Sequence, residues 1–144
     1  MIPWPIERLL PHAAPMLLLD EALRYDEDSV TAAVTLGPDH LFATPDGVPA
    51  HLGIELMAQT CGIWAGAHAM ASGGAVRVGY LLGSRRYTAA RPWFRIGERL
   101  EITATVVFRD QGMGVFDCLI FSDGETVAEA QLSVYQPDQD EGKP

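Results

Sequence analysis

The chain has 144 residues, enough for one domain with a substantial hydrophobic core. Its formal net charge of −9 argues against a nucleic-acid partner, because such partners need a basic surface. The two cysteines and four histidines show neither zinc-finger nor HExxH spacing, so we expect reduced core thiols and no metal site. The first twelve residues lack the basic start and long apolar run of a signal peptide, so we expect a cytoplasmic protein.

The N-terminal part of the chain is predicted to form a short helix and a hairpin. Residues 6–10 favour a helix, and residues 16–25 and 29–36 favour strands, since the second run alternates apolar and polar side chains. The acidic link at 26–28 is typical of a turn. Residues 37–50 contain three prolines and two glycines and are predicted to be a loop.

The stretch from Pro49 to Gly66 is predicted to begin a long helix with one carboxylate, Glu55, in its middle. Helical spacing places His51, Glu55 and Gln59 on one face, because side chains four residues apart lie above one another. Apolar residues cover most other directions, so we expect a buried core helix and not a membrane span. Burial favours the protonated form of a carboxylic acid, which makes Glu55 a candidate general acid. The alternative is a Glu55 that is solvated or paired with an arginine.

The same helix contains glycines at positions 53, 62 and 66. Each costs about 1 kcal/mol relative to alanine in a helix. They indicate that another part of the molecule approaches the helix closely. A Ser-Gly-Gly sequence at 72–74 is predicted to end it.

The C-terminal part of the chain alternates in the manner of strands with one buried face. The predicted strands span 75–88, 99–109, 113–121 and 125–135. The links at 110–112 and 122–124 are short enough for antiparallel neighbours. We therefore expect an α+β fold in which an antiparallel sheet curls around one central helix. The domain is predicted to span 1–135, with a disordered acidic tail at 136–144.

Charge is segregated along the sequence. Seven arginines and two acidic residues lie between 77 and 109, a local balance of +5, whereas the remaining three basic and seventeen acidic residues carry −14. If these arginines gather in space, they form a basic landing site for an acidic partner. The alternative is a scattered, solvated strand face.

Four segments, in order along the chain, carry a resemblance to a known family. They are LLPHAAPMLLLDEAL (9–23), GVPAHLGIELMAQ (47–59), GYLLGSRRY (79–87) and FRIGERLEITATV (94–106). The set resembles the hotdog-fold beta-hydroxyacyl carrier-protein dehydratases of fatty-acid synthesis, and more closely a divergent dehydratase-like branch associated with aryl polyene or related polyketide clusters. The resemblance implies a hotdog fold, a curled antiparallel sheet wrapped around one long central helix, and no metal or organic cofactor.

The resemblance also implies catalytic positions. The family's acid lies on the long helix, and Glu55 falls on that position. The family's base is a histidine in a His-Phe-Pro-Gly segment, which this chain lacks; the spacing would place it at Leu41. His40 is the nearest substitute, His51 is a competing candidate, and a third alternative is that neither acts as base.

Further roles concern substrate and carrier protein. The N–H of Gly53, in the first helical turn, is a candidate to polarise the thioester carbonyl. Gln59 is a candidate to orient substrate or water beside the acid, or else bonds a helix carbonyl. His51 is a further candidate for substrate binding, or else caps or packs at the start of the helix. Arg85, Arg86 and Arg91 lie in or beside the segment that in this family resembles the rim of the tunnel mouth, and are candidates for carrier-protein docking.

The leading hypothesis is a 3-hydroxyacyl carrier-protein dehydratase in fatty-acid-like or polyketide assembly. The second is a catalytically weak or inactive subunit that binds an acyl carrier protein or completes a heterodimer with an active dehydratase. The third is a hotdog thioesterase in which Glu55 activates water. The resemblance implies a homodimer or heterodimer whose sheets pack edge to edge, with the acyl chain entering a tunnel at the interface.

Overall fold

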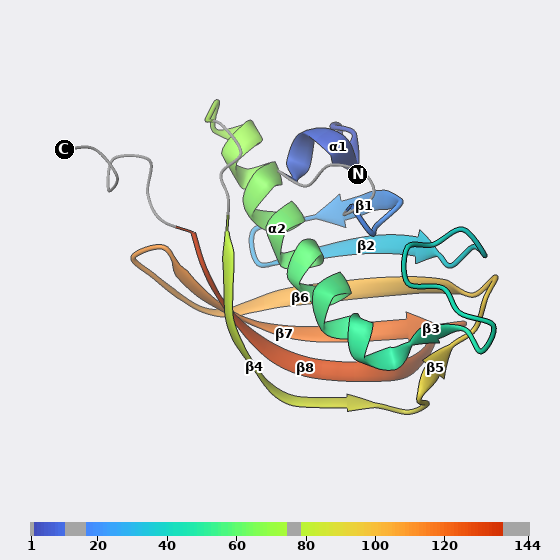
Figure 1. Ribbon diagram of the computed structural model, residues 1–144. Coiled ribbons are helices and arrows are strands. Elements are labelled where there is room, and N and C mark those ends of the chain that lie inside the picture. The colour runs from blue at the N-terminus through green and yellow to red at the C-terminus, as the bar shows by residue number, and fades with distance from the viewer. Residues whose placement is uncertain (1, 11–16, 75–78, 137–144) are drawn as a thin grey trace.

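The computed structural model describes residues 2–10, 17–74 and 79–136. The helical elements are α1 (Ile6–Leu9), the 3-10 turn η1 (Ala50–Leu52) and α2 (Gly53–Ala71). The strands are β1 (Glu21–Tyr25), β2 (Ser29–Thr35), β3 (Val48–Pro49), β4 (Tyr80–Ala89), β5 (Trp93–Phe94), β6 (Arg99–Asp110), β7 (Met113–Ser122) and β8 (Glu125–Tyr135). An antiparallel six-stranded sheet, in the order β1-β2-β6-β7-β8-β4, curls around α2 (Figure 1). This is the predicted α+β arrangement.

The two hairpins near the C-terminus follow from their turn residues. Gln111 and Gly112 join β6 to β7 with φ angles of 49° and 84°. Asp123 and Gly124 join β7 to β8 with φ angles of 51° and 80°. Two central residues with positive φ make a type I′ turn, whose twist matches that of antiparallel strands. The predicted antiparallel neighbours are confirmed.

The first strand is shorter than predicted. β1 begins at Glu21, whereas the apolar run favours a strand from residue 16, which itself lies outside the described residues. The N–H of Leu18 donates to Oε1 of Gln59 on α2 at 2.9 Å. Because the Leu18 N–H is hydrogen-bonded to a side chain of α2, the segment before β1 is held against that helix. β4 is likewise described only from Tyr80, since residues 75–78 lie outside the described part.

The glycines of α2 lie where other segments approach it. A side chain at Gly66 would collide with the carbonyl of Leu9, and one at Gly53 would collide with the hydroxyl of Tyr87. The predicted close approach is therefore confirmed. α2 ends at Ala71, followed by Gly73 at φ 78°, as the Ser-Gly-Gly sequence predicts.

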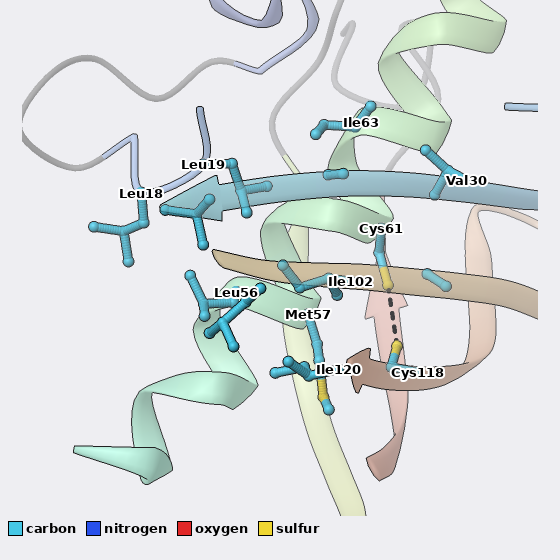
Figure 2. Packing of buried hydrophobic residues seen from close by; sticks show 14 of the residues in the cluster. Leu18, Leu19, Val30, Leu56, Met57, Cys61, Ile63, Ile102, Cys118 and Ile120 are labelled. Carbon is cyan, nitrogen blue, oxygen red and sulfur yellow. Dashed lines mark hydrogen bonds between the residues drawn. The ribbon is translucent and has the colours of Figure 1, made fainter. Parts of the chain in front are cut away.

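The buried face of α2 packs on the concave face of the sheet. Figure 2 shows Met57 beside Ile120 and Cys61 facing Cys118. The two sulfur atoms are 3.8 Å apart. Both cysteines are free and buried, and burial raises the pKa of the Cys61 thiol well above its ordinary value. This agrees with the prediction of reduced core thiols.

No helix in the described part of the chain is long and apolar enough to cross a membrane. Of the predicted acidic tail, only Gln136 is described, and its N–H donates to the carbonyl of Gly112 at 2.8 Å. Residues 137–144 lie outside the described residues, so the domain boundary at 135 stays a prediction.

Candidate active site

A cavity of about 650 Å³ lies along α2 and over one end of the sheet. Its helical wall extends from Glu55 on α2 to Ser72, which directly follows the helix. The opposite wall is formed by β4, the β6–β7 hairpin and the end of β8. The cavity therefore combines one candidate catalytic residue, Glu55, with a long wall of mixed apolar and polar side chains.

Glu55 is only partly buried, because it faces this cavity. The surroundings of Glu55 are therefore less apolar than the leading prediction of a buried acid implies, and the partial exposure agrees with the alternative of a partly solvated carboxyl group. Nε2 of Gln59 donates to Oε1 of Glu55 at 3.2 Å, while Oε1 of Gln59 accepts the Leu18 N–H. A backbone N–H can only donate, so the Gln59 atom that faces the Leu18 N–H must be the carbonyl oxygen. The NH₂ group of Gln59 therefore points toward Glu55. Gln59 is 1% exposed, so it is a fixed support for the acid.

His40 does not line the cavity. Its Nδ1 accepts the N–H of Phe42 at 3.2 Å, and its Nε2 is buried with no hydrogen-bond partner among the described residues. An imidazole whose Nδ1 accepts a hydrogen bond carries its proton on Nε2, so neither nitrogen offers a free lone pair. Burial lowers the pKa of His40, which outweighs the opposing charge of Asp20 and favours the neutral ring. In this chain His40 therefore completes a loop turn outside the cavity, and its role as the base stays a prediction.

His51 and Gly53 are also separated from the cavity lining. His51 is exposed in η1, and the tighter 3-10 turn breaks the helical face predicted to join it to Glu55. The N–H of Gly53 bonds the carbonyls of Ala50 and His51, so it is engaged within the turn. The hydroxyl of Tyr87, which donates to the Ala50 carbonyl, fills the space beside Gly53. Gly53 therefore serves close packing in place of the free donor that the sequence suggests.

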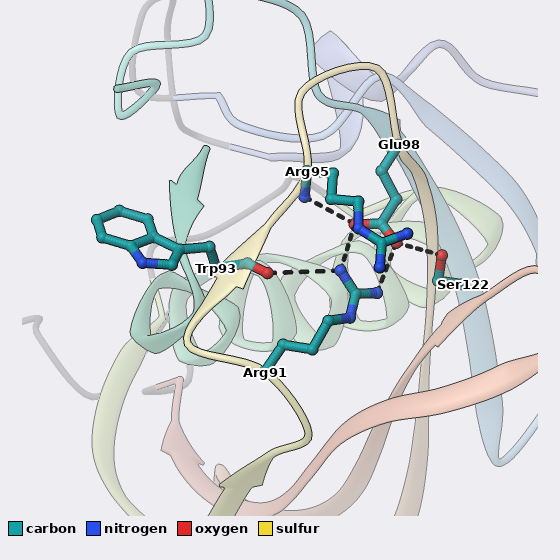
Figure 3. Close-up of polar contacts among 5 residues, drawn as sticks. All are labelled: Arg91, Trp93, Arg95, Glu98 and Ser122. Atoms are coloured by element: carbon teal, nitrogen blue, oxygen red, sulfur yellow. Dashed lines mark hydrogen bonds and ion pairs between the residues drawn. The ribbon is translucent and has the colours of Figure 1, made fainter. Parts of the chain in front are cut away.

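Arg91 belongs to an internal network (Figure 3). Its guanidinium donates to both carboxylate oxygens of Glu98, at 3.1 and 2.6 Å, and Glu98 also accepts from Ser122 and from the Arg95 N–H. Burial alone would raise the pKa of Glu98, but the hydrogen bonds from Arg91 and Ser122 outweigh it and lower the pKa to about 2. Arg91 therefore stabilises the link between β5 and β6.

The other two predicted docking arginines differ from Arg91. Arg85 and Arg86 are exposed on β4, at one edge of the sheet. A register irregularity follows Arg85, and Arg86 has a φ of 55°, so the strand is kinked there. Arg77 lies outside the described residues. Arg85 and Arg86 are therefore the arginines that place exposed positive charge on β4.

Sequence reasoning missed one feature of the cavity. The guanidinium of Arg109 lies 5.1 Å from the centre of the Trp64 ring, and both residues line the cavity. The centre of the Trp64 ring also lies 4.4 Å from the centre of the His68 ring and 5.6 Å from the centre of the Phe116 ring. Helical periodicity places Trp64 in the core, but no local signal connects it to an arginine in a distant strand.

An antiparallel sheet curled around one long helix defines the class as hotdog-fold proteins. The chain belongs to the ApeP-like family, whose model, described as ApeP dehydratase, matches residues 4–143. The resemblance to the dehydratase branch of aryl polyene clusters is therefore confirmed.

Individual relatives agree with this assignment. The chain is 33% identical to a chain of the dehydratase heterocomplex ApeI:P from Xenorhabdus doucetiae, covering 96% of this chain and 94% of that one with a TM-score of 0.91. It is 31% identical over 140 residues to the 3-hydroxyacyl-(acyl-carrier-protein) dehydratase FabZ of Campylobacter lari, covering 88% of this chain and 91% of the relative. A hypothetical thioesterase from Streptococcus pneumoniae TIGR4 shares only the fold, at 15% identity, 83% and 86% coverage and a TM-score of 0.65.

Proposed function

We propose that this chain is one subunit of a 3-hydroxyacyl carrier-protein dehydratase of fatty-acid-like or aryl polyene assembly. In this proposal it supplies Glu55 as the general acid, and a related partner subunit supplies the base. The observation that carries the proposal is that Glu55 and its support Gln59 line the cavity whereas His40 and His51 do not.

The reaction needs two proton transfers. A base removes the proton from C2 of the 3-hydroxyacyl thioester, and the C–H electron pair forms the C2–C3 double bond. The C3–O bond breaks, and the departing hydroxyl takes the proton of Glu55 and leaves as water. Gln59 donates to one Glu55 oxygen at 3.2 Å, which holds the carboxyl group toward the substrate. The one histidine among the described cavity-lining residues is His68, whose ring contacts the Asp26 carbonyl through Nε2 at 2.9 Å. It lies about 20 Å along α2 from Glu55, too far to act on the carbon next to the one that Glu55 serves.

Two exposed surfaces support a partner subunit. β4 is an edge strand, and its Leu81 and Leu82 are 42% and 55% exposed. An exposed edge with apolar side chains is a template for pairing with another sheet. Leu41, the position that corresponds to the family's base, is 46% exposed in the loop before η1. The heterocomplex of the Xenorhabdus doucetiae relative makes a heterodimer with a related dehydratase the favoured assembly, with a homodimer as the alternative.

The remaining parts of the proposal concern the carrier protein and the cell compartment. Arg85 and Arg86, exposed on β4, are proposed to receive the acidic carrier protein that delivers the thioester. Arg91 is not included, because its guanidinium is paired with Glu98. The working compartment is proposed to be the cytoplasm, where carrier-linked substrates are made.

The test is a product assay with a 3-hydroxyacyl carrier-protein thioester. The chain is assayed alone, then together with a related dehydratase subunit that has a His-Phe-Pro-Gly segment, and the mixture is repeated with Glu55→Gln. We expect the enoyl product from the mixture and little from the chain alone. Glu55→Gln should lower the turnover of the mixture to the level of the partner assayed by itself.

Other outcomes select the alternatives. Full turnover by the chain alone would place the base within this subunit. An unchanged mixture with Glu55→Gln would make the chain a non-catalytic partner. Release of free acid in place of the enoyl thioester would identify a thioesterase.

A further inference from the structure

The loop between β2 and β3, residues 36–47, is held at both ends by the segment that contains β5. At the start of the loop, the carbonyl of Leu36 accepts the N–H of Gly97 at 2.5 Å. At its end, Gly47 packs so closely on the carbonyl of Phe94 that a side chain at Gly47 would collide with it. Figure 1 shows this loop on the side of the molecule where α2 begins. The loop therefore has a fixed position, outside the cavity that extends along α2.

Hydrogen bonds within the loop turn its histidine inward and its apolar tip outward. The N–H of His40 donates to the Gly37 carbonyl at 3.1 Å, and the His40 carbonyl accepts from Ala43 at 2.9 Å. The His40 ring accepts the N–H of Phe42 and buries its Nε2 atom. Leu41 and Phe42 are 46% and 38% exposed. The tip that can meet another subunit thus presents two hydrocarbon side chains, while its imidazole is turned away.

The symmetry of a dimer connects this tip to the site of the partner. In a two-fold assembly the subunits exchange equivalent contacts, so a loop that crosses in one direction is matched by a loop that crosses in the other. The inference rests on the proposed function, in which the partner brings a base to Glu55 of this chain. That base belongs to the partner's equivalent of the loop at 36–47. By the same rotation, the tip of this chain's loop reaches the acid of the partner.

We propose that the heterodimer contains one productive site, at Glu55, and one non-productive site, in which Leu41 of this chain occupies the place of the base opposite the partner's acid. A leucine side chain cannot accept a proton, so a substrate bound there keeps the hydrogen on C2. Asp39 and Asp46 lie on either side of the tip. Turnover supported by either carboxylate would require the partner's acid and would be detected as its contribution.

The experiment uses the heterodimer purified through a different affinity tag on each subunit, which removes homodimers. Conversion of a 3-hydroxyacyl carrier-protein thioester to the enoyl product is measured with the acid of one subunit at a time changed to its amide. We expect Glu55→Gln to lower turnover by about 10²–10⁴ and the same change in the partner to leave it unchanged. A loss of half in each variant would reveal two working sites and overturn this inference alone. Full turnover in Glu55→Gln would overturn the proposed function.

A gain of activity is the second measurement. Leu41→His, added to the Glu55→Gln heterodimer, supplies an imidazole opposite the partner's acid and should raise turnover by about tenfold or more. Phe42→His in the same background is the matched control, since Phe42 is the neighbouring exposed apolar residue of the loop. Recovery in neither variant, or equal recovery in both, would overturn the position assigned to Leu41.

The affinity between the subunits tests the contact itself. Leu41→Asp should raise the dissociation constant of the heterodimer by about tenfold or more, because the burial of a leucine is lost and a carboxylate is desolvated. Val107→Asp is the control, since Val107 is 50% exposed on β6 at the opposite end of the sheet. An unchanged dissociation constant in Leu41→Asp, or an equal rise in Val107→Asp, would contradict the placement of the loop at the interface.

Discussion

The first turns of α2 and the loop that precedes η1 each carry a titratable residue expected to act in catalysis, but they hold it in opposite ways. Glu55 on α2 faces a cavity, and its carboxyl group is supported by Gln59. His40 in the loop uses Nδ1 for the Phe42 N–H and buries Nε2. The comparison shows that a residue of a type common in catalysis is available for a reaction only where its reactive atom is accessible and is held in place by a hydrogen bond.

The backbone explains much of this difference. Gln59 is on the same rigid helix as Glu55, one turn later, and is anchored to Leu18. The loop forms its own turns, in which the His40 N–H donates to Gly37 and the His40 carbonyl accepts from Ala43. The ring of His40 therefore completes a local turn, whereas the carboxyl of Glu55 is positioned by contacts from outside its own turn.

The largest effect is expected at Glu55. Glu55→Gln keeps the size of the side chain but cannot donate an acidic proton, so turnover of the assembly should fall by about 10²–10⁴. The enoyl product of the heteromeric mixture is the measurement, and the melting temperature of the variant checks that the fold is intact. Full activity in a folded variant would show that the acid lies elsewhere.

A smaller effect is expected at the support of that acid. Gln59→Leu removes the hydrogen bond to Glu55 and leaves the buried Leu18 N–H unsatisfied, which costs about 1–3 kcal/mol of stability. We expect kcat to fall by about tenfold with little change in KM, because orientation and not binding is lost. Thr60→Val is the control, since the buried Thr60 hydroxyl donates to the helix carbonyl of Leu56. Equal kinetic losses in both variants would assign the effect to helix packing.

The loop histidine should matter to stability and not to turnover. Its folded pKa lies below the ordinary 6.5, so the unfolded chain binds the proton more readily. The contribution of neutral His40 is complete above about pH 6.5 and is lost as the pH falls toward the lowered folded pKa. Urea unfolding between about pH 7 and pH 5 should show a smaller loss for His40→Asn, which keeps an acceptor for Phe42 without titrating in this range. Loss of turnover in His40→Asn at pH 7 would restore His40 as a base.

The smallest effect is expected at the edge strand. Arg85→Glu and Arg86→Glu should each slow association with a carrier-linked substrate, by about tenfold or less at low ionic strength and less in higher salt. A small thioester without carrier should react at the unchanged rate. Arg24→Glu on β1, at the opposite edge of the sheet, is the control for net charge. If Arg24→Glu slows association equally, the effect belongs to the overall charge and not to β4.

Local patterns in the sequence determined most of the architecture. The alternating apolar residues of β2, β6 and β8 and the glycines at 112 and 124 define strands and turns through interactions among near neighbours. The segment 47–59 is one continuous stretch of the chain, so the sequence alone was enough to predict Glu55 as the acid.

Only the tertiary structure decided what each candidate residue can do. The Leu18–Gln59 hydrogen bond joins residues 41 positions apart, and the Arg109–Trp64 contact depends on sheet register. The pairing of Arg91 with Glu98 likewise shows that Arg91 is held within the structure, unlike the exposed Arg85 and Arg86. Periodicity assigns a side chain to a face, but its accessibility and hydrogen-bond partners depend on distant segments that reach it only when the sheet closes around α2.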